Sequence, residues 1–416
     1  MTLWQPEYRI KANGSDVTGI TLAGFTITSG RKDINAPTEA GYCNLNLILL
    51  DNQSFDFDVN TSITIEVKKS NGSYVGLFGG RISDVATQVN SAGSSAVVTR
   101  MNITALGALS KLQRAIFDGT LAEGLDGAQI LDLLDDLLLN SWNELPATET
   151  WASYDPATQT WQGAENIGLG EIDAGDYTLR SRQISNQFIA GVAQSIASSA
   201  GGYLYEDANG NIGYADQSHR QDYLVANGYT DLDARNALFA GISSLSRQGD
   251  IVNKLTIQHG TNFSNSHTSQ DLTSQGIYGL YAEAFDSYIK NSADVTNFAN
   301  QIIKLRAYPR ARFQSITFPI HITAIDDATR DALLQIFMGL PIRITNLPGN
   351  ITDGQFEGFV EGWTFRSSNN GLFLTITASP TAYNAVAQQW AQVTATEAWN
   401  TILNTLKWED AIGVIS

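Results

Sequence analysis

The chain has 416 residues and a formal net charge of −17, and charged residues make up only 16% of it. This length allows two to four domains, and the low share of charged residues is typical of a subunit whose surface relies on neutral polar residues and on partners. Because the sequence contains no block of lysine or arginine, it excludes a protein that binds nucleic acid through a cationic stripe.

Targeting signals and clusters of cysteine or histidine are missing from the sequence. Residues 1–10 are polar, and no apolar run approaches the ~20 residues of a membrane helix. We therefore expect synthesis in the cytoplasm, with neither a signal peptide nor a membrane-spanning segment. Cys43 is the single cysteine, which excludes an intrachain disulfide, and the four histidines lack zinc-site spacing. Cys43 lies in an alternating segment and is expected to be a small side chain of a strand.

Residues 1–110 are expected to form an antiparallel β-barrel or sandwich domain. Turn signals at residues 13–14 and 71–72, both Asn-Gly, separate short segments in which apolar and polar residues alternate. Such alternation gives each strand one face for a core and another for solvent.

Residues 111–216 change character and are expected to form an insertion domain of helices and one hairpin. After Asp126, which can cap a helix, apolar residues recur at helical spacing. A second helix is expected over 186–199, and the aromatic residues of 203–214 flank an Asn-Gly turn that predicts a β-hairpin.

The later part of the chain is expected to contain a linker and a lead-in strand over 217–257, a second mixed insertion over 258–310, and a second β-barrel domain over 311–380. Apolar residues at helical spacing predict helices over 294–305 and 327–338.

Tryptophans gather in two segments without clear periodicity. Residues 141–180 are expected to form an ordered extension or a long loop, because disordered segments are poor in aromatic residues. The C-terminal tail 381–416 carries three tryptophans nine residues apart. Buried aromatic side chains dominate interface energetics, so we expect these residues to contact neighbouring subunits. The interface candidates are Trp151, Trp161, Trp390, Trp399 and Trp408.

One scheme of three strands occurs twice, far apart in the chain. Each copy has an alternating strand, a second strand with a glycine at its start, a polar loop, and a third strand that contains Ile-Thr-Ala. The copies are residues 63–67, 80–85 and 101–105, and residues 342–344, 358–363 and 374–378. The chain is therefore expected to contain one small β-domain twice, which suits the building of a ring or tube better than the binding of a substrate.

No residue pattern of an enzyme or a metal site stands out. Glu357 and Glu361 lie on one face of a strand, where a glycosidase could place its two carboxylates, but exposed carboxylates of a β-barrel are the commoner case. Residues 207–211 resemble a calcium loop, yet the position that requires glycine is Ile212, so a hairpin turn is favoured. We predict a protein that is not an enzyme and binds no cofactor and no metal.

The order of several segments resembles the baseplate-hub, or tail-tip hub, family of tailed bacteriophages, which includes minor tail proteins of long-tailed phages. The resemblance extends over most of the chain and rests on order and spacing, not on one specific motif. The matching segments are residues 8–10, 16–18, 77–85, 203–212, 249–255, 274–279, 299–313 and 356–380, followed by the tryptophan-containing tail.

The resemblance implies an α+β, mainly β fold with two related antiparallel β-barrel domains like those of a tail tube and with helical or mixed insertion domains between them. It implies a homotrimer whose three chains close a pseudo-sixfold ring at the distal end of the virion tail. The partners that it implies are the distal tail protein or tail tube, tail fibre or tip proteins, and the C-terminus of the tape-measure protein, with DNA only in transit.

Two alternative functions stay open beside the structural hub. In the first, the chain is a receptor-binding tail protein whose Trp151 and Trp161 stack on glycans; in the second, it is a cell-wall glycosidase that uses Glu357 and Glu361. For the hub itself, we expect much of the net charge of −17 to line the channel, so that DNA slides past without binding.

Overall fold

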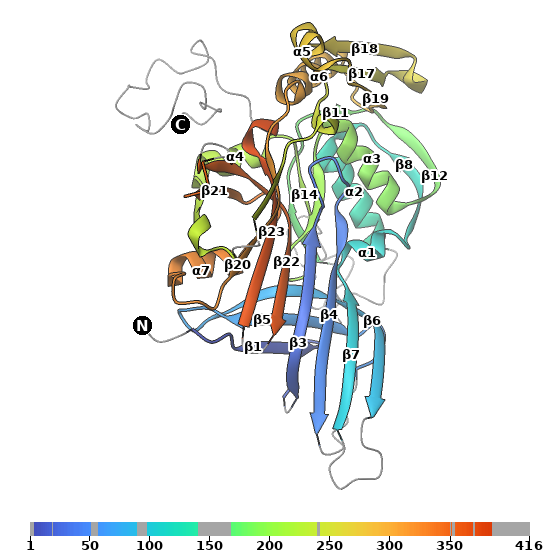
Figure 1. Ribbon diagram of the computed structural model, residues 1–416. Helices are drawn as coiled ribbons and strands as arrows, with labels where there is room; N and C mark the ends of the chain where they lie inside the picture. The colour runs from blue at the N-terminus through green and yellow to red at the C-terminus, as the bar shows by residue number, and fades with distance from the viewer. Residues whose placement is uncertain are drawn as a thin grey trace.

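A computed structural model shows long strands side by side in the lower half of the molecule, with helices and smaller sheets above them (Figure 1). The structure describes residues 4–18, 20–50, 57–89, 98–139, 168–238, 242–349, 351, 354–368 and 371–384. Within these ranges no helix is both long and apolar enough to cross a membrane.

Thirteen strands, from the N-terminal part of the chain and from its second half, join in one sheet. Its strands are β1 (Tyr8–Ala12), β2 (Ser15–Asp16), β3 (Thr21–Gly30), β4 (Glu39–Leu50), β5 (Ser62–Lys68), β6 (Tyr74–Val89), β7 (Val98–Leu106), β15 (Thr230–Asp233), β16 (Ile242–Leu245), β20 (Arg312–Pro319), β21 (Pro341–Thr345), β22 (Phe356–Ser368) and β23 (Gly371–Pro380). The order is β16-β20-β23-β22-β3-β4-β7-β6-β5-β1-β2, and β21 joins β15 to β22. The fold is mainly β, and the described strands form an open path and not a closed barrel.

Alternation of apolar residues explains why these segments form strands with one buried face. In β4, the side chains of Cys43, Leu45, Leu47 and Leu49 are buried, and those between them are more exposed. The buried faces of strands from both parts of the sheet share one apolar core, and each large apolar side chain there contributes about 1.5–3 kcal/mol. The prediction for Cys43 is confirmed, and burial raises the pKa of its thiol to about 12.

The two sequence copies fold into the same unit of strands. We call β3 to β7 the first unit, and β16 with β20 to β23 the second unit. In the first unit Ile63 lies opposite Gly80, and in the second Ile342 lies opposite Gly358. The repeat expected from the sequence is therefore confirmed at the level of these strands and their register.

A β-bulge lies at the same place in both units. The extra residue is Ser83 in β6 and Glu361 in β22. The flanking pairs are Ile82–Ala105 and Asp84–Thr104 in the first unit, and Val360–Ala378 and Gly362–Thr377 in the second. Because a bulge bends and twists its strand, the same bend recurs in each copy.

Helices and four smaller sheets form the upper part of the molecule around a second apolar core. Their elements are α1 (Leu109–Leu112), β8 (Ile116–Leu121), β9 (Gly124–Leu125), α2 (Asp126–Leu139), β10 (Gly168–Ile172), β11 (Thr178–Leu179), β12 (Arg182–Phe188), α3 (Ile189–Ala200), β13 (Tyr203–Glu206), β14 (Asn211–Ala215), β17 (Lys254–His259), β18 (Asn265–Gln270), α5 (Leu272–Tyr278), β19 (Ala282–Asp286) and α6 (Ser292–Arg306). Two further helices contact the large sheet: α4 (His219–Asn227) contacts β21, and α7 (Asp327–Leu334) contacts β15.

The helices α2, α3, α6 and α7 and the hairpin β13–β14 confirm the predictions made for them, apart from their ends. The helix expected from residue 186 begins at Ile189, because the preceding residues pair with β8 as strand β12. Asp126 begins α2, but its carboxylate is buried and accepts hydrogen bonds from the Tyr177 N–H (2.8 Å) and the Tyr214 hydroxyl (2.6 Å). It thus ties the helix to two neighbouring segments.

Candidate functional site

The two units meet edge to edge at a junction formed by β22 and β3. Residues 362–368 pair antiparallel with residues 24–30, so one sheet continues from the second unit into the first (Figure 1). Gly30 has a φ of +89°, and a Cβ at this position would collide with the carbonyl oxygen of Glu361. A glycine is therefore required for the two backbones to approach this closely.

A buried ion cluster lies at the bulged end of this junction. Glu361 is fully buried and accepts hydrogen bonds from Arg31 Nε (2.6 Å) and from Arg220 Nη1 and Nη2 (2.8 and 2.9 Å). Burial alone would raise the pKa of Glu361, but the two guanidinium groups lower it to about 2. Arg220 also donates to the Tyr203 hydroxyl (3.2 Å). The cluster thus connects β22, β3 and its following loop, α4 and β13.

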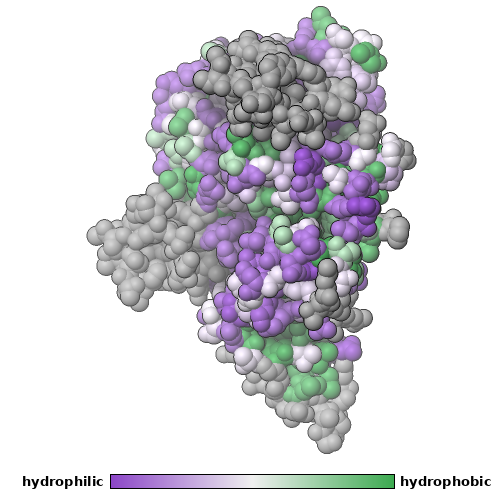
Figure 2. All heavy atoms as spheres, turned by 90° about the vertical axis from the view of Figure 1, so that its left-hand side faces the viewer, coloured by the Kyte–Doolittle hydropathy of each residue, from purple (hydrophilic) through white to green (hydrophobic). Residues whose placement is uncertain are grey.

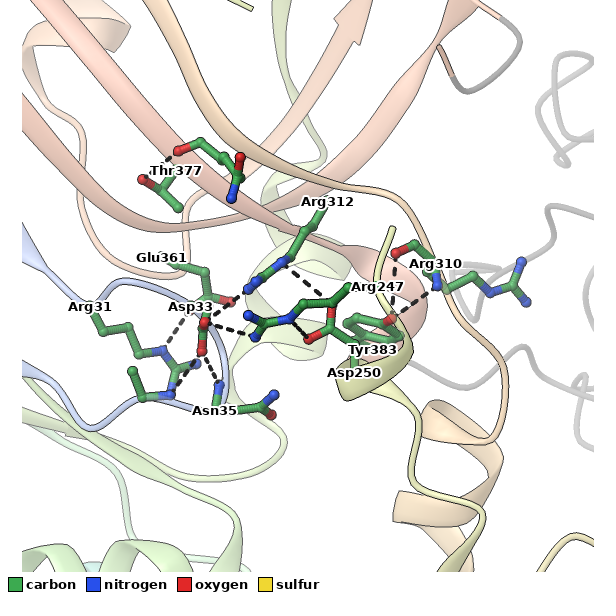
Figure 3. Close-up of polar contacts among 12 residues, drawn as sticks. Arg31, Asp33, Asn35, Arg247, Asp250, Arg310, Arg312, Glu361, Thr377 and Tyr383 are labelled. Carbon is green, nitrogen blue, oxygen red and sulfur yellow. Dashed lines mark hydrogen bonds and ion pairs between the residues drawn. The ribbon is translucent and has the colours of Figure 1, made fainter. Parts of the chain in front are cut away.

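A second ion cluster lies beside the first (Figure 3). Asp33 Oδ2 lies 3.0 Å from Arg312 Nη1 and 3.2 Å from Arg247 Nη2. Arg247 Nε in turn donates to Asp250 Oδ1 (2.8 Å). Burial opposes ionisation of Asp33, yet the hydrogen bond and charge of Arg312 hold the pKa of this carboxyl below its usual value. The loop after β3 is therefore fixed to Arg312, which begins β20, and to Arg247, which follows β16.

The face of the large sheet that points away from the core carries mainly hydroxyl and amide side chains. We call it the polar face, and its neutral members include Thr26, Thr28, Asn44, Asn46, Asn102, Thr104, Thr317, Thr364, Thr375 and Thr377. Oγ1 atoms of threonines on neighbouring strands lie 3.2 Å apart at the junction (Thr28 and Thr364) and 2.9 Å apart in the second unit (Thr317 and Thr375). The polar face thus continues across the junction.

Exposed apolar side chains lie at the distal ends of two strands. Leu50 at the end of β4 is 46% exposed and Val89 at the end of β6 is 51% exposed. Figure 2 shows the side of the molecule that lies on the left of Figure 1, where apolar groups gather near the lower end beneath a mainly hydrophilic surface. Exposed apolar groups of this kind suit contact with another protein.

The sequence-based site residues fall into two classes in the structure. The five interface candidates, Trp151, Trp161, Trp390, Trp399 and Trp408, lie outside the described residues. Of the possible glycosidase pair, Glu361 is buried and ion-paired, so the expectation that it is an exposed carboxylate was wrong. A carboxyl held ionised in this way is unsuited to donate a proton as a general acid. In the described ranges, no three His, Cys, Asp or Glu side chains are grouped so that they could hold a metal ion.

Sequence reasoning missed the arginines that hold the junction together. Arg31 follows β3 directly, and Arg220 lies in α4, a helix in a region that gave no clear periodicity. The only signal was the charged Glu361 next to the apolar residues Phe359 and Val360, since a buried carboxylate requires cationic partners. The identity of those partners depends on contacts between residues far apart in the sequence.

A scan against models of protein families found no match, and neither did a search of curated proteins. Solved structures give a different result. The 43 kDa tail protein of prophage MuSo2 from Shewanella oneidensis matches with a TM-score of 0.56 and 13% identity, over 91% of this chain and 99% of its own. The tail protein from Neisseria meningitidis MC58 matches with a TM-score of 0.59 and 11% identity, over 92% of this chain and 98% of its own. The chain therefore shares its fold, over nearly its whole length, with two tail proteins.

Proposed function

We propose that this chain is a structural subunit of a bacteriophage tail tip, and that three copies form a ring around the path of the DNA. The observation that carries the proposal is the duplicated strand unit, whose two copies lie side by side in one continuous sheet. The fold shared with two tail proteins over more than nine tenths of each chain supports it.

The duplication has a simple consequence for symmetry. A chain with two equivalent units presents six such units when three chains assemble, so a threefold protein can match a sixfold partner. In such a ring each unit is a barrel-like domain completed by its neighbours, and the segments 111–216 and 258–310 form domains outside the ring. The ring joins the tail tube or distal tail protein on one side to fibre or tip proteins on the other, and the tape-measure C-terminus reaches its channel.

The polar face is the wall of the channel in this arrangement. Its threonine and asparagine side chains carry no charge that would attract or repel phosphate, and its exposed charged residues include both signs: Arg100, Arg366 and Asp84. Passage of DNA then depends on neutral polar groups. An excess of carboxylates along the channel, as expected from the net charge of −17, stays a prediction for the assembled ring.

The test is the mass of the assembled protein. Light scattering on the purified full-length chain is expected to give three times the chain mass of 45.1 kDa, and antibody labelling of virions is expected to place the chain at the distal end of the tail. A stable monomer, or an assembly whose number of chains is not a multiple of three, would contradict the proposal.

A further inference from the structure

The outer half of β6 lacks a partner on one side. β6 pairs with β7 from Arg81 to Val89, whereas its pairing with β5 runs from Tyr74 only as far as Arg81. From Ser83 to Val89, no strand lies on the side opposite β7 among the residues that the structure describes. This half of β6 is therefore an open sheet edge with unpaired backbone groups.

The corresponding half of β22 has a partner strand on this side. The matched bulges make Gly362 the counterpart of Asp84, and residues 362–368 pair with β3. Under that cover Phe365 is 1% exposed, while its counterpart Thr87 in β6 is exposed. The first unit thus leaves open the edge that the second unit closes.

The other end of the sheet offers a strand of matching kind. β16 pairs with β20 in the second unit in the same way as β3 pairs with β4 in the first. Ile242 lies opposite Ile316 in the second unit, and Phe25 lies opposite Leu45 in the first. β16 is therefore the counterpart of β3. It is the terminal strand of the path formed by the described residues, and Ile242 is only half-buried where Phe25 is 2% exposed.

These two edges are the counterparts of the two strands that form the internal junction. We propose that β16 of one copy pairs antiparallel with the outer half of β6 of a second copy, in the register of β22 and β3. The inference rests on the proposed ring and names the surface that closes it. The resulting pairs are Asp84 with Arg247, Val85 with Ser246, Ala86 with Leu245, Thr87 with Ser244, Gln88 with Ser243, and Val89 with Ile242.

The chemistry of this register is complementary. It places the exposed Asp84 opposite Arg247, whose side chain is 42% exposed although it already contacts Asp33 and Asp250. Opposite charges on directly paired residues stabilise a sheet. It also covers Val89, which is 51% exposed in the single chain, with Ile242. At the position of Glu361 the first unit has Ser83, so the junction between copies lacks the buried ion cluster and is held less tightly than the internal one.

Paired cysteines test the register directly. Directly opposite residues on antiparallel strands have Cα atoms about 4.5–5.5 Å apart, which lies within the range that a disulfide spans. The variants Thr87→Cys with Ser244→Cys and Gln88→Cys with Ser243→Cys, examined separately in the full chain, cover one narrow and one wide position of the ladder. Thr87→Cys with Ser243→Cys is the matched control, because a shift of one residue turns the side chains to opposite faces. Cys43 is buried and stays in all variants.

After mild oxidation, at least one matched variant is expected to run as covalent dimers and trimers on a non-reducing gel, and the mismatched control as single chains. A chain that is trimeric in solution but gives no cross-link, or cross-links equally in the control, would overturn the pairing and leave the proposed ring intact. A chain that is monomeric in solution would overturn both.

A second variant requires no disulfide. Asp84→Arg changes an exposed residue and places two arginines opposite each other. We expect it to raise the trimer dissociation constant about tenfold or more while the melting temperature of the dissociated chain stays unchanged. An unchanged dissociation constant would count against the register.

Discussion

Replacement of Glu361 by glutamine is expected to destabilise the fold more than any other single change of a charged residue at the junction. The usual pKa of 4.5 is lowered to about 2 by Arg220 and Arg31, and this difference corresponds to about 3 kcal/mol of stability at neutral pH. Glutamine leaves two buried guanidinium groups without a counter-charge, which by comparison with other broken buried pairs costs about 3–5 kcal/mol.

Urea unfolding at pH 7, monitored by tryptophan fluorescence, measures this loss as a decrease in the free energy of the first unfolding transition. Asp231→Asn is the matched control, because it removes a carboxylate from a surface ion pair with Arg343 (2.6 Å), in which the Asp231 side chain is 59% exposed and that of Arg343 is 30% exposed. Surface pairs contribute less than about 1 kcal/mol. The stabilisation by Glu361 is present above pH 4.5 and is lost as the pH falls toward 2, so the two proteins should converge in acid. A loss for Glu361→Gln no larger than that of the control would refute the role of the ion cluster.

Three further outcomes are expected. Glu206 is buried and accepts hydrogen bonds from two backbone N–H groups, but burial raises its pKa from 4.5 to about 7, so up to about 3 kcal/mol of stability should be lost as the pH rises from about 4.5 to 7. Glu206→Gln should lack this slope, and an unchanged slope would contradict the assignment. Gly30→Ala should lower the melting temperature clearly more than Gly72→Ala, since both have positive φ but only Gly30 faces backbone atoms. Deletion of residues 388–416 should reduce the trimer fraction in light scattering, and full assembly without them would rule out the tail as an anchor.

Local patterns in the sequence were sufficient to identify the repeat. The glycine at the start of the second strand and the Ile-Thr-Ala of the third recur because each copy needs the same close approach and the same alternation of faces. The hairpin β13–β14 was also predictable, since its Asn-Gly turn acts over a few residues. Signals of this kind depend only on residues close together in the sequence, so one sequence is enough to recognise them.

The joining of the two units was not predictable in the same way. Residues 24–30 pair with residues 362–368. The sequence of either segment does not identify its partner, because a strand of alternating polar and apolar residues can pair with many other strands equally well. For the same reason Glu361 was expected to be exposed, whereas its fate depends on Arg31 and Arg220, which lie more than a hundred residues away from it along the chain. Helices α4 and α5 are short and carry weak amphipathic patterns, so tertiary contacts decide them.

An electron-microscopic image of the purified full-length chain tests the central claim most directly. We predict class averages of a closed ring with threefold symmetry, in which six similar units surround a central channel. Particles that are monomeric, or rings whose symmetry is not threefold, would contradict it.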